Sequence, residues 1–181
     1  KSQLIKGSVL ITGGGKRLGS IIAQDLAQSG WKVILHYNKS EKSAKETQKK
    51  ILERGGEVIL YKKEIKDSIS ANELIKFSLE QSFFSKNKSQ LFSLINNASA
   101  FLYDDGKNMS EDILDVHMHA NFRIPTFLIK ALSDALPSSL KASVINMLDS
   151  KLYGLNPDHY SYTLSKFALL GLTKVAALAY A

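Results

Sequence analysis

Short apolar runs alternate with longer segments of helical periodicity along most of the chain. Five of the runs are rich in β-branched or bulky apolar residues and have the length of buried strands. Glycines follow several of the helical segments, which is typical of helix ends. The predicted strands are Gly7 to Thr12, Trp31 to Tyr37, Val58 to Tyr61, Leu91 to Asn96 and Ser143 to Leu148.

The segments between the strands predict helices. Ser70 and Glu73 have the spacing of a capping box, which places a helix start at Ser70. Pro125 should kink or interrupt a long helical stretch, because proline lacks an N–H and clashes with the preceding turn. The predicted helices are Leu18 to Ser29, Ser40 to Arg54, Ser70 to about Phe84, Ser110 to about Ala135 and Tyr160 to Ala181.

Strands separated by helix-length segments predict βαβ units, and therefore a parallel sheet covered on both faces. No repeat or linker interrupts this order, so one domain is expected over residues 1–181. The expected fold class is α/β, with a Rossmann-like, doubly wound parallel sheet. Such sheets bind ligands beyond the carboxyl ends of their strands. The segments expected there are Thr12–Arg17, Tyr37–Ser40, Asn96–Phe101 and Asp149–Ser150.

The first of these segments is rich in glycine. The strand ending at Thr12 continues as Gly13-Gly14-Gly15-Lys16-Arg17-Leu18-Gly19 and then enters a helix. Glycines let the backbone approach a pyrophosphate, and a helix N-terminus offers unpaired N–H groups. This context favours a dinucleotide site over an ordinary tight turn. The GK[ST] ending of a P-loop is absent, which disfavours an ATPase.

The end of the second predicted strand indicates which dinucleotide fits. An acidic residue there bonds the ribose hydroxyls of NAD and repels a 2′-phosphate. This chain has His36-Tyr37-Asn38-Lys39-Ser40 instead. Lys39 offers a charge and Ser40 a hydroxyl for a phosphate, with Arg17 in the adjacent turn. The pattern favours NADPH over NADH, although Lys39 also fits an ordinary solvated surface.

Tyr162 and Lys166 are four residues apart in the last predicted helix, so they share a face. A free tyrosine has a pKa near ~10, too high for easy proton exchange at neutral pH. A nearby ammonium favours the phenolate, so Lys166 is expected to lower the pKa of Tyr162. YxxxK alone occurs by chance in many helices. It gains weight here from the fifth strand before it and the glycine-rich turn near the start.

Together these motifs resemble the short-chain dehydrogenase/reductase family over essentially the whole chain. The matching features are the Thr12–Gly19 turn, Asn96-Asn97-Ala98, Asn121 and the Tyr162–Lys166 pair. The resemblance implies that Tyr162 donates a proton, that Lys166 lowers its pKa and holds the nicotinamide ribose, and that Asn121 anchors a water in the proton relay. It also implies a cofactor site made of Thr12, Gly13, Gly15, Lys16, Arg17, Leu18, Gly19, His36, Tyr37, Asn38, Lys39, Ser40, Glu64, Ile65, Asn97, Ala98, Ser99, Tyr162 and Lys166.

Two departures from the family pattern are informative. Arg17 stands in the turn where most members have glycine, and Asp149 stands where the catalytic serine belongs. An ionised aspartate cannot donate to a carbonyl, and it repels the alkoxide formed when a ketone is reduced. A protonated Asp149 could pass a proton through Tyr162, whereas an ionised one could accept from N–H groups of a nitrogen heterocycle. Both suit C=N reduction better than C=O reduction.

These departures resemble the pteridine reductase branch and its bacterial relatives, the dihydromonapterin and dihydrofolate reductases of the short-chain type. The shared segments are Arg17, His36 to Ser40, Asn96-Asn97-Ala98-Ser99-Ala100-Phe101 and Asn146-Met147-Leu148-Asp149. This resemblance implies that Phe101 stacks a pterin, that Ser99 and Arg17 contact cofactor phosphates and the pterin edge, and that Asp149 acts with Tyr162 in protonation. It implies NADPH-dependent reduction of a dihydropterin to a tetrahydropterin by a homotetramer.

Alternative interpretations remain open from the residues. Phe101 also fits an ordinary core position. Asp149 also fits a helix cap or a salt bridge, with Ser150 serving a carbonyl reductase that acts on a ketone or oxoacyl substrate. His159 fits a substrate pocket or a surface turn. A sensor or scaffold that binds NADPH without turnover is a further alternative.

Composition narrows the remaining classes. The chain has 24 basic and 17 acidic residues and a net charge of +7, but its lysines are scattered, so a solvated surface is favoured over nucleic-acid binding. The absence of cysteine excludes a disulfide scaffold and a cysteine-ligated zinc site. His117 and His119 point to different sides of a helix, so no metal is expected. No apolar run spans a bilayer and Lys1 to Lys6 leave no room for a signal peptide, so the cytoplasm is the expected compartment.

The length of 181 residues is short for the family that the chain resembles. That resemblance implies a sixth strand, a segment covering the substrate and a seventh strand after the helix of Tyr162 and Lys166. No Pro-Gly segment and no closing Gly-Gly strand follow that helix in this sequence. The C-terminal strands are therefore expected to be missing, in a fragment or an incompletely ordered chain.

Overall fold

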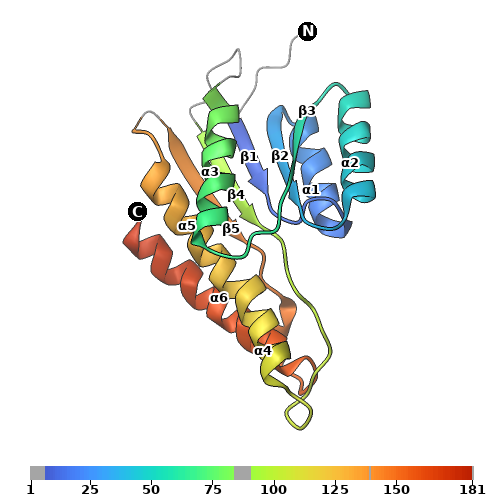
Figure 1. Cartoon of the computed structure of the whole chain (residues 1–181), viewed down its shortest axis with the longest axis vertical. Coiled ribbons are helices and arrows are strands. Elements are labelled where there is room, and N and C mark those ends of the chain that lie inside the picture. The colour runs from blue at the N-terminus through green and yellow to red at the C-terminus, as the bar shows by residue number, and fades with distance from the viewer. Residues whose placement is uncertain (1–6, 84–90, 139, 181) are drawn as a thin grey trace.

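A parallel five-stranded sheet organises the chain in the computed structural model, which describes residues 7–83, 91–138 and 140–180 (Figure 1). The strand order is β3-β2-β1-β4-β5. The chain moves outward from β1 to β3 and then crosses back to the other side of β1, and doubly wound sheets bind ligands where the order reverses in this way. The predicted fold class is confirmed. The strands are β1 (Gly7–Ile11), β2 (Trp31–Tyr37), β3 (Glu57–Lys62), β4 (Leu91–Asn96) and β5 (Lys141–Asn146).

Helices cover both faces of the sheet (Figure 1). Successive side chains of a strand point to opposite faces, so Val9 and Leu10 of β1 belong to two separate cores. The core around Val9 lies under α1 (Arg17–Gln28) and α2 (Glu41–Glu53). The core around Leu10 lies under α3 (Ser68–Phe83), α5 (Ile124–Ala135) and α6 (Tyr160–Ala179). Burial on both faces explains why β1 is a continuous apolar run rather than an alternating pattern.

Helix α3 begins before the predicted position. The Asp67 carboxylate accepts the Ser70 N–H at 2.8 Å, and the Ser70 hydroxyl oxygen accepts the Asp67 N–H at 3.1 Å. This reciprocal pair is a capping box in which Asp67 is the first member and Ser70 the second. Glu73 instead forms a surface ion pair with Lys63. The predicted capping box of Ser70 with Glu73 is therefore wrong, because Asp67 provides the cap three residues earlier.

Strand β5 is also displaced from its predicted range of Ser143 to Leu148. Its pairing with β4 runs from Leu91↔Lys141 to Asn96↔Asn146, so both strands end together. The Met147 N–H then donates to the Asn96 carbonyl at 3.1 Å, and the chain leaves the sheet. As a result, the segment ending at Asp149 lies beyond the carboxyl edge of the sheet rather than within a strand.

The predicted interruption of the helix near Pro125 is confirmed. Helix α4 (Glu111–Met118) continues into a π-helical turn at His119–Arg123, after which α5 begins. Pro125 has no N–H to donate to the carbonyl of Asn121, four residues earlier, so the ordinary α-helical bond cannot form there. Such π-helical turns frequently lie at functional sites.

None of the helices described here is long and apolar enough to cross a membrane. Three sequence predictions fall on residues outside those described. They concern the start of the chain at Lys1 to Lys6, the end of the third predicted helix at Phe84 and the end of the last one at Ala181.

The capping box of α3 leads to a stability prediction. The substitution Asp67→Ala should lower the free energy of unfolding by about 1 kcal/mol, because it leaves helix N–H groups without their acceptor. Glu73→Ala is the matched control and should change it by less than about 0.5 kcal/mol, since it removes only an exposed ion pair. Urea denaturation of both variants is the measurement. Equal losses in the two variants would contradict the assignment of the cap.

Candidate active site

The glycine-rich turn after β1 depends on very close packing. Gly13 has a φ of +63°, and a Cβ there would lie 2.8 Å from the Cα of Ala98. A Cβ on Gly19 would lie 2.5 Å from the Nδ2 of Asn97. Glycine is required at both positions, because no larger residue fits without moving the backbone. The turn is thereby held directly against the segment that follows β4.

Hydrogen bonds between Thr12 and Asn97 fasten these two segments together. The Thr12 hydroxyl oxygen accepts the N–H groups of Asn97 and Ala98, each at 3.1 Å. The Asn97 side-chain amide donates to the carbonyls of Thr12 and Gly13 at 3.0 and 3.1 Å. The ends of β1 and β4 are therefore fixed relative to each other at the point where the strand order reverses.

Arg17 begins α1 in an unusual backbone conformation. Its φ is +47°, in the left-handed region where an L-residue other than glycine costs roughly 1–2 kcal/mol. The arginine found where the family pattern has glycine thus occupies a position that glycine would suit. Helix α1 has no side-chain cap and no acid in its first turn, so its N-terminal N–H groups remain available to an anion. Lys16, Arg17 and Leu18 are exposed there.

His36, at the end of β2, supports the glycine turn from within. Its Nδ1 accepts the Gly13 N–H at 3.4 Å, so the neutral ring carries its proton on Nε2 and donates it to the Lys63 carbonyl at 2.8 Å. Burial lowers the pKa of His36, which keeps the ring neutral. Tyr37 is likewise buried in the core. The predicted cofactor residues His36 and Tyr37 therefore face the protein interior.

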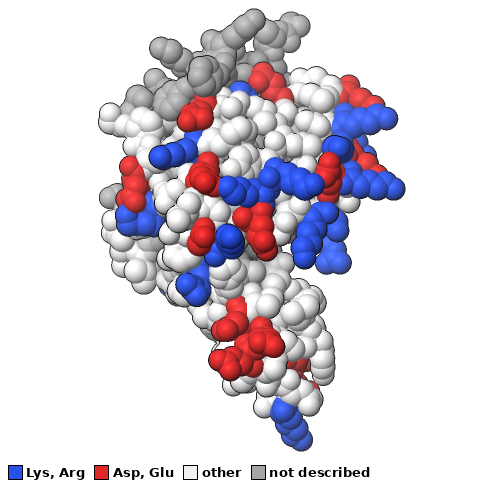
Figure 2. All heavy atoms as spheres, viewed as in Figure 1, with Lys and Arg blue, Asp and Glu red and all other residues white. Residues whose placement is uncertain are grey.

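The surface that follows β2 carries an exposed lysine among lysines that are paired with an acid. Lys39 is exposed and makes no ion pair with any residue in the described ranges. The nearby acid Glu41 forms ion pairs with Lys45 and Lys62 instead. These two ammonium groups lower the pKa of Glu41 to about 2. Figure 2 shows basic and acidic side chains interspersed over α2 and β3. Among the remaining predicted cofactor residues, Asn38 and Glu64 are exposed, while Ser40 and Ile65 are half-buried.

Tyr162, Asp149 and Lys166 lie together at the carboxyl edge of the sheet. The Tyr162 hydroxyl donates to the Asp149 carboxylate at 2.7 Å. The Lys166 Nζ lies 5.7 Å from the centre of the Tyr162 ring and donates to the Met147 carbonyl at 2.8 Å. Tyr162 and Lys166 are both buried, and Asp149 is partly buried. Ser150 is exposed, and its backbone carbonyl accepts the N–H groups of Tyr153 and Gly154.

The pKa of Tyr162 shifts in the direction opposite to the one expected from the sequence. Burial raises the pKa of Tyr162, and the Asp149 carboxylate raises it further. The expected lowering by Lys166 is therefore wrong for this structure. Burial also lowers the pKa of Lys166 itself. The Lys151 N–H, assisted by the Tyr162 hydroxyl, lowers the pKa of Asp149. Tyr162 is thus protonated and Asp149 ionised at neutral pH.

Aromatic side chains pack beside the Tyr162 ring. The Phe101 ring stacks on His159 with centroids 4.1 Å apart and meets the edge of Tyr162 at 4.7 Å. Phe101 is 55% exposed, so it is a surface residue and not part of the core. Tyr103 adds an edge contact to His159 at 5.4 Å. An exposed aromatic ring therefore lies beside the side chain that donates to Asp149.

Asn121, in the π-helical turn, fixes the segment after β4. Its Oδ1 accepts from the Ala100 N–H at 2.8 Å and from the Ser99 hydroxyl at 3.0 Å. Its Nδ2 donates to the Ala100 carbonyl and to the Ser165 hydroxyl. The side chain is therefore fully used within the protein. A water anchored by this residue would have to use the backbone carbonyl that Pro125 leaves without its usual donor.

Residues that the sequence analysis did not assign to the site also meet there. Buried Asp104, His117 and Ser161 form a connected hydrogen-bond network beside Tyr162. One signal was available, because His117 lies four residues before Asn121 on the same helical stretch. Nothing in the local pattern links Asp104 to Ser161, which is 57 residues away in sequence.

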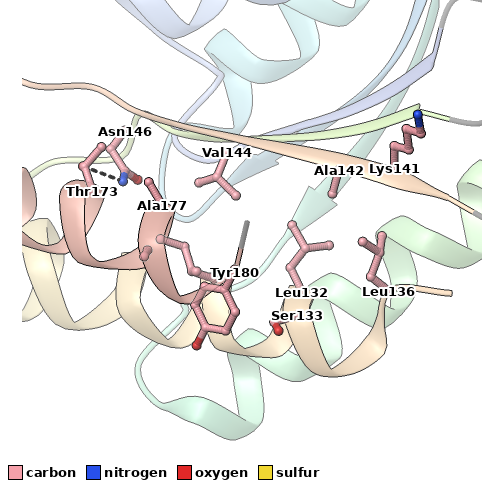
Figure 3. Close-up of a pocket in the computed structure, with 12 residues that line it drawn as sticks. Leu132, Ser133, Leu136, Lys141, Ala142, Val144, Asn146, Thr173, Ala177 and Tyr180 are labelled. Atoms are coloured by element: carbon pink, nitrogen blue, oxygen red, sulfur yellow. Dashed lines mark hydrogen bonds between the residues drawn. The ribbon is translucent and has the colours of Figure 1, made fainter. Parts of the chain in front are cut away.

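A separate apolar hollow of about 670 Å³ lies between α5, α6 and β5 (Figure 3). Leu132, Val144 and Tyr180 are among its lining residues, and Asn146 donates to the Thr173 hydroxyl at one end. None of the residues of the Tyr162 cluster lines it. The hollow therefore does not belong to the candidate active site.

Comparison with known proteins identifies the family of this chain. The chain matches the short chain dehydrogenase family over residues 7–181, so it belongs to that family. An uncharacterized oxidoreductase of Thermotoga maritima is 32% identical over 174 residues, which are 95% of this chain and 65% of the relative. A hydroxynaphthalene reductase-like protein Arp2 of Metarhizium majus is 24% identical and is covered to 61%. The chain thus spans less than two thirds of the length of these relatives.

Solved structures resemble the chain over almost its full length. FolM alternative dihydrofolate reductase 1 from Brucella canis, complexed with NADP, has a TM-score of 0.84 and 30% identity, and the match covers 99% of this chain and 70% of that one. The promiscuous reductase LugOII, which catalyses a keto-reduction in lugdunomycin biosynthesis, has a TM-score of 0.81 and 25% identity, with 98% and 70% covered.

The Tyr162 environment leads to a titration prediction. Asp149→Asn should lower the pKa of Tyr162, because it removes a negative charge that opposes the phenolate. The pKa should stay above that of a free tyrosine, since burial is the larger cause and persists. NMR of ring-labelled tyrosine against pH measures the change. Asp134→Asn, at a surface ion pair on α5, is the control, and identical Tyr162 titrations in both variants would contradict the interpretation.

Proposed function

We propose that the full-length protein reduces a dihydropterin to a tetrahydropterin with NADPH. One observation carries the proposal: an ionised Asp149 accepts from the Tyr162 hydroxyl where a carbonyl reductase needs a donor. A carboxylate next to a forming alkoxide opposes ketone reduction. The same carboxylate can accept hydrogen bonds from the amino and ring N–H groups of a pterin. The site therefore suits a nitrogen heterocycle.

The residues present fit a dinucleotide phosphate cofactor. The close-packed glycines leave the turn without side chains that would block a pyrophosphate, and the start of α1 offers N–H groups. Lys39 and Arg17 are exposed cations suited to a 2′-phosphate. Lys166, beside the Tyr162 ring, would hold the ribose. When bound, NADPH would supply the hydride.

The chain's own residues would handle the proton. The raised pKa keeps Tyr162 protonated, as a proton donor must be before reaction. A substrate N–H that donates to Asp149 would replace the Tyr162 hydroxyl as its partner and free that hydroxyl for the C=N nitrogen. The exposed Phe101 ring offers a stacking face for the pterin.

The likeness to a Brucella dihydrofolate reductase of the FolM type supports this substrate class. The second candidate is reduction of a ketone, which the likeness to LugOII favours. In that case Ser150 would donate to the carbonyl. The two candidates differ in which of two neighbouring residues the reaction requires.

Substrate and variant tests separate the candidates. The full-length protein should oxidise NADPH with dihydropterins faster than with ketones. Asp149→Ala should lower kcat/KM for the dihydropterin by about 100-fold, because it removes the charged acceptor of the substrate N–H groups, and a hydrogen bond to a charged group contributes about 1.5–3 kcal/mol. Ser150→Ala, the adjacent control, should change it by less than about threefold. Turnover of ketones alone, or dependence on Ser150 instead of Asp149, would exclude the pterin proposal.

Cofactor choice is tested separately. Lys39→Ala should raise KM for NADPH by about tenfold and leave KM for NADH unchanged, because it removes a charge-assisted contact to the 2′-phosphate. Lys42→Ala, an exposed lysine of α2, is the matched control and should alter neither value. Steady-state kinetics with both cofactors give the answer. An equal effect of Lys39→Ala on both cofactors would contradict this role.

A further inference from the structure

The segment that carries Phe101 lies between β4 and α4 and is exposed from 101 to 103. Apolar packing alone cannot determine its position, because more than half of the Phe101 side chain is accessible. Asn121 holds the residue before Phe101, and two further hydrogen bonds hold the backbone of the residue after it, Leu102. This backbone is bound on both sides by histidine rings.

The two histidines bind opposite polar groups of Leu102. The Leu102 N–H donates to the Nε2 of His117 at 2.9 Å. The Leu102 carbonyl accepts from the Nδ1 of His159 at 2.9 Å. His159 also stacks on the Phe101 ring. The position of that ring is thereby tied to both histidines.

His117 is itself held in one state by a buried network. Its Nε2 accepts from Leu102, so the neutral ring carries its proton on Nδ1 and donates it to the Ser161 hydroxyl oxygen at 2.7 Å. The Ser161 hydroxyl in turn donates to the Asp104 carboxylate at 2.5 Å. His117 and Ser161 are fully buried and Asp104 is 1% exposed. Burial lowers the pKa of His117, which preserves the accepting Nε2.

The same network connects the segment to the helix of the proton donor. The Asp104 carboxylate accepts the Ser161 N–H at 3.1 Å, in the first turn of α6. Helix α6 has no side-chain cap from its own N-cap residue, His159, so Asp104 provides an acceptor from another segment. Tyr162 follows directly after Ser161. Phe101 and Tyr162 are therefore positioned by one continuous set of hydrogen bonds.

We propose that His117 is a specificity-determining positioning residue. By accepting the Leu102 N–H, it fixes the backbone next to Phe101 and so holds that ring beside Tyr162, where a flat heterocycle would stack on it. This inference rests on the proposed function, because it assumes a substrate that stacks on Phe101. The imidazole takes no part in proton transfer, since both of its nitrogens are engaged within the protein.

Two substitutions separate the two bonds of His117. In His117→Gln the side-chain oxygen can take the place of Nε2 and keep the Leu102 N–H bonded, while the contact to Ser161 is lost. In His117→Asn the side-chain amide can take the place of Nδ1 and keep the contact to Ser161, while the Leu102 N–H loses its acceptor. Both variants remove the same ring, so general loss of packing affects them alike.

The kinetic readout is KM for the dihydropterin in the full-length protein. His117→Asn should raise it by about tenfold, the scale of one lost hydrogen bond, and His117→Gln should stay within about threefold of the wild type. KM for NADPH should not change in either variant. Equal dihydropterin KM values in the two variants would overturn the inference.

A structural readout distinguishes this inference from the proposed function. Amide hydrogen exchange at Leu102 should be fast in His117→Asn and slow in His117→Gln. If the wild type does not turn over dihydropterins, the proposed function fails, and equal exchange in the two variants would independently refute the positioning role. If the histidine variants do not fold, Ser161→Ala provides the test. It should raise the dihydropterin KM by a few-fold, and no change would count against the network.

Discussion

The hydrogen bonds between Thr12 and Asn97 are the connection on which the site depends. A parallel sheet brings the carboxyl ends of its strands to one edge, but it does not by itself fix the loops that continue from them. Thr12 accepts from the backbone after β4, and Asn97 donates to the backbone after β1. The glycine turn and the segment leading to Phe101 are thus parts of one rigid unit. Asn121 extends this unit to α6 through Ser165.

Burial determines the chemistry of the charged groups in this unit. Tyr162 and Lys166 are both desolvated, and each therefore resists its charged form. Asp149 is the exception, because it accepts hydrogen bonds from Lys151 and Tyr162 that stabilise its charge. A neutral donor beside a stable anion is an arrangement that orients a substrate carrying N–H groups. Hydrogen bonding and desolvation together therefore keep Tyr162 protonated and Asp149 ionised.

Much of the fold could be predicted from apolar periodicity, since the parallel strands are buried on both faces and appear as continuous runs. The end of β5 could not, because its register depends on pairing with β4 over a separation of 50 residues. The start of α3 was misplaced because two overlapping cap patterns compete locally, and only the folded chain shows that Asp67 is used. The spacing of Tyr162 and Lys166 shows the neighbouring charge but not the extent of burial, so it predicts a lowered pKa of Tyr162 where burial raises it. Asp104 joins Ser161 through tertiary contacts alone, which no local pattern encodes.

Strand β5 affects how residues 1–181 would behave in solution by themselves. It lies at the end of the described sheet order, and its side chains are exposed, including Val144 and Ile145. The unpaired backbone groups of such an edge can pair with another chain, and an adjoining apolar hollow adds to this tendency. A preparation of residues 1–181 alone would therefore risk strand-to-strand aggregation. Light scattering should accompany any assay on it, so that loss of activity is not mistaken for loss of chemistry.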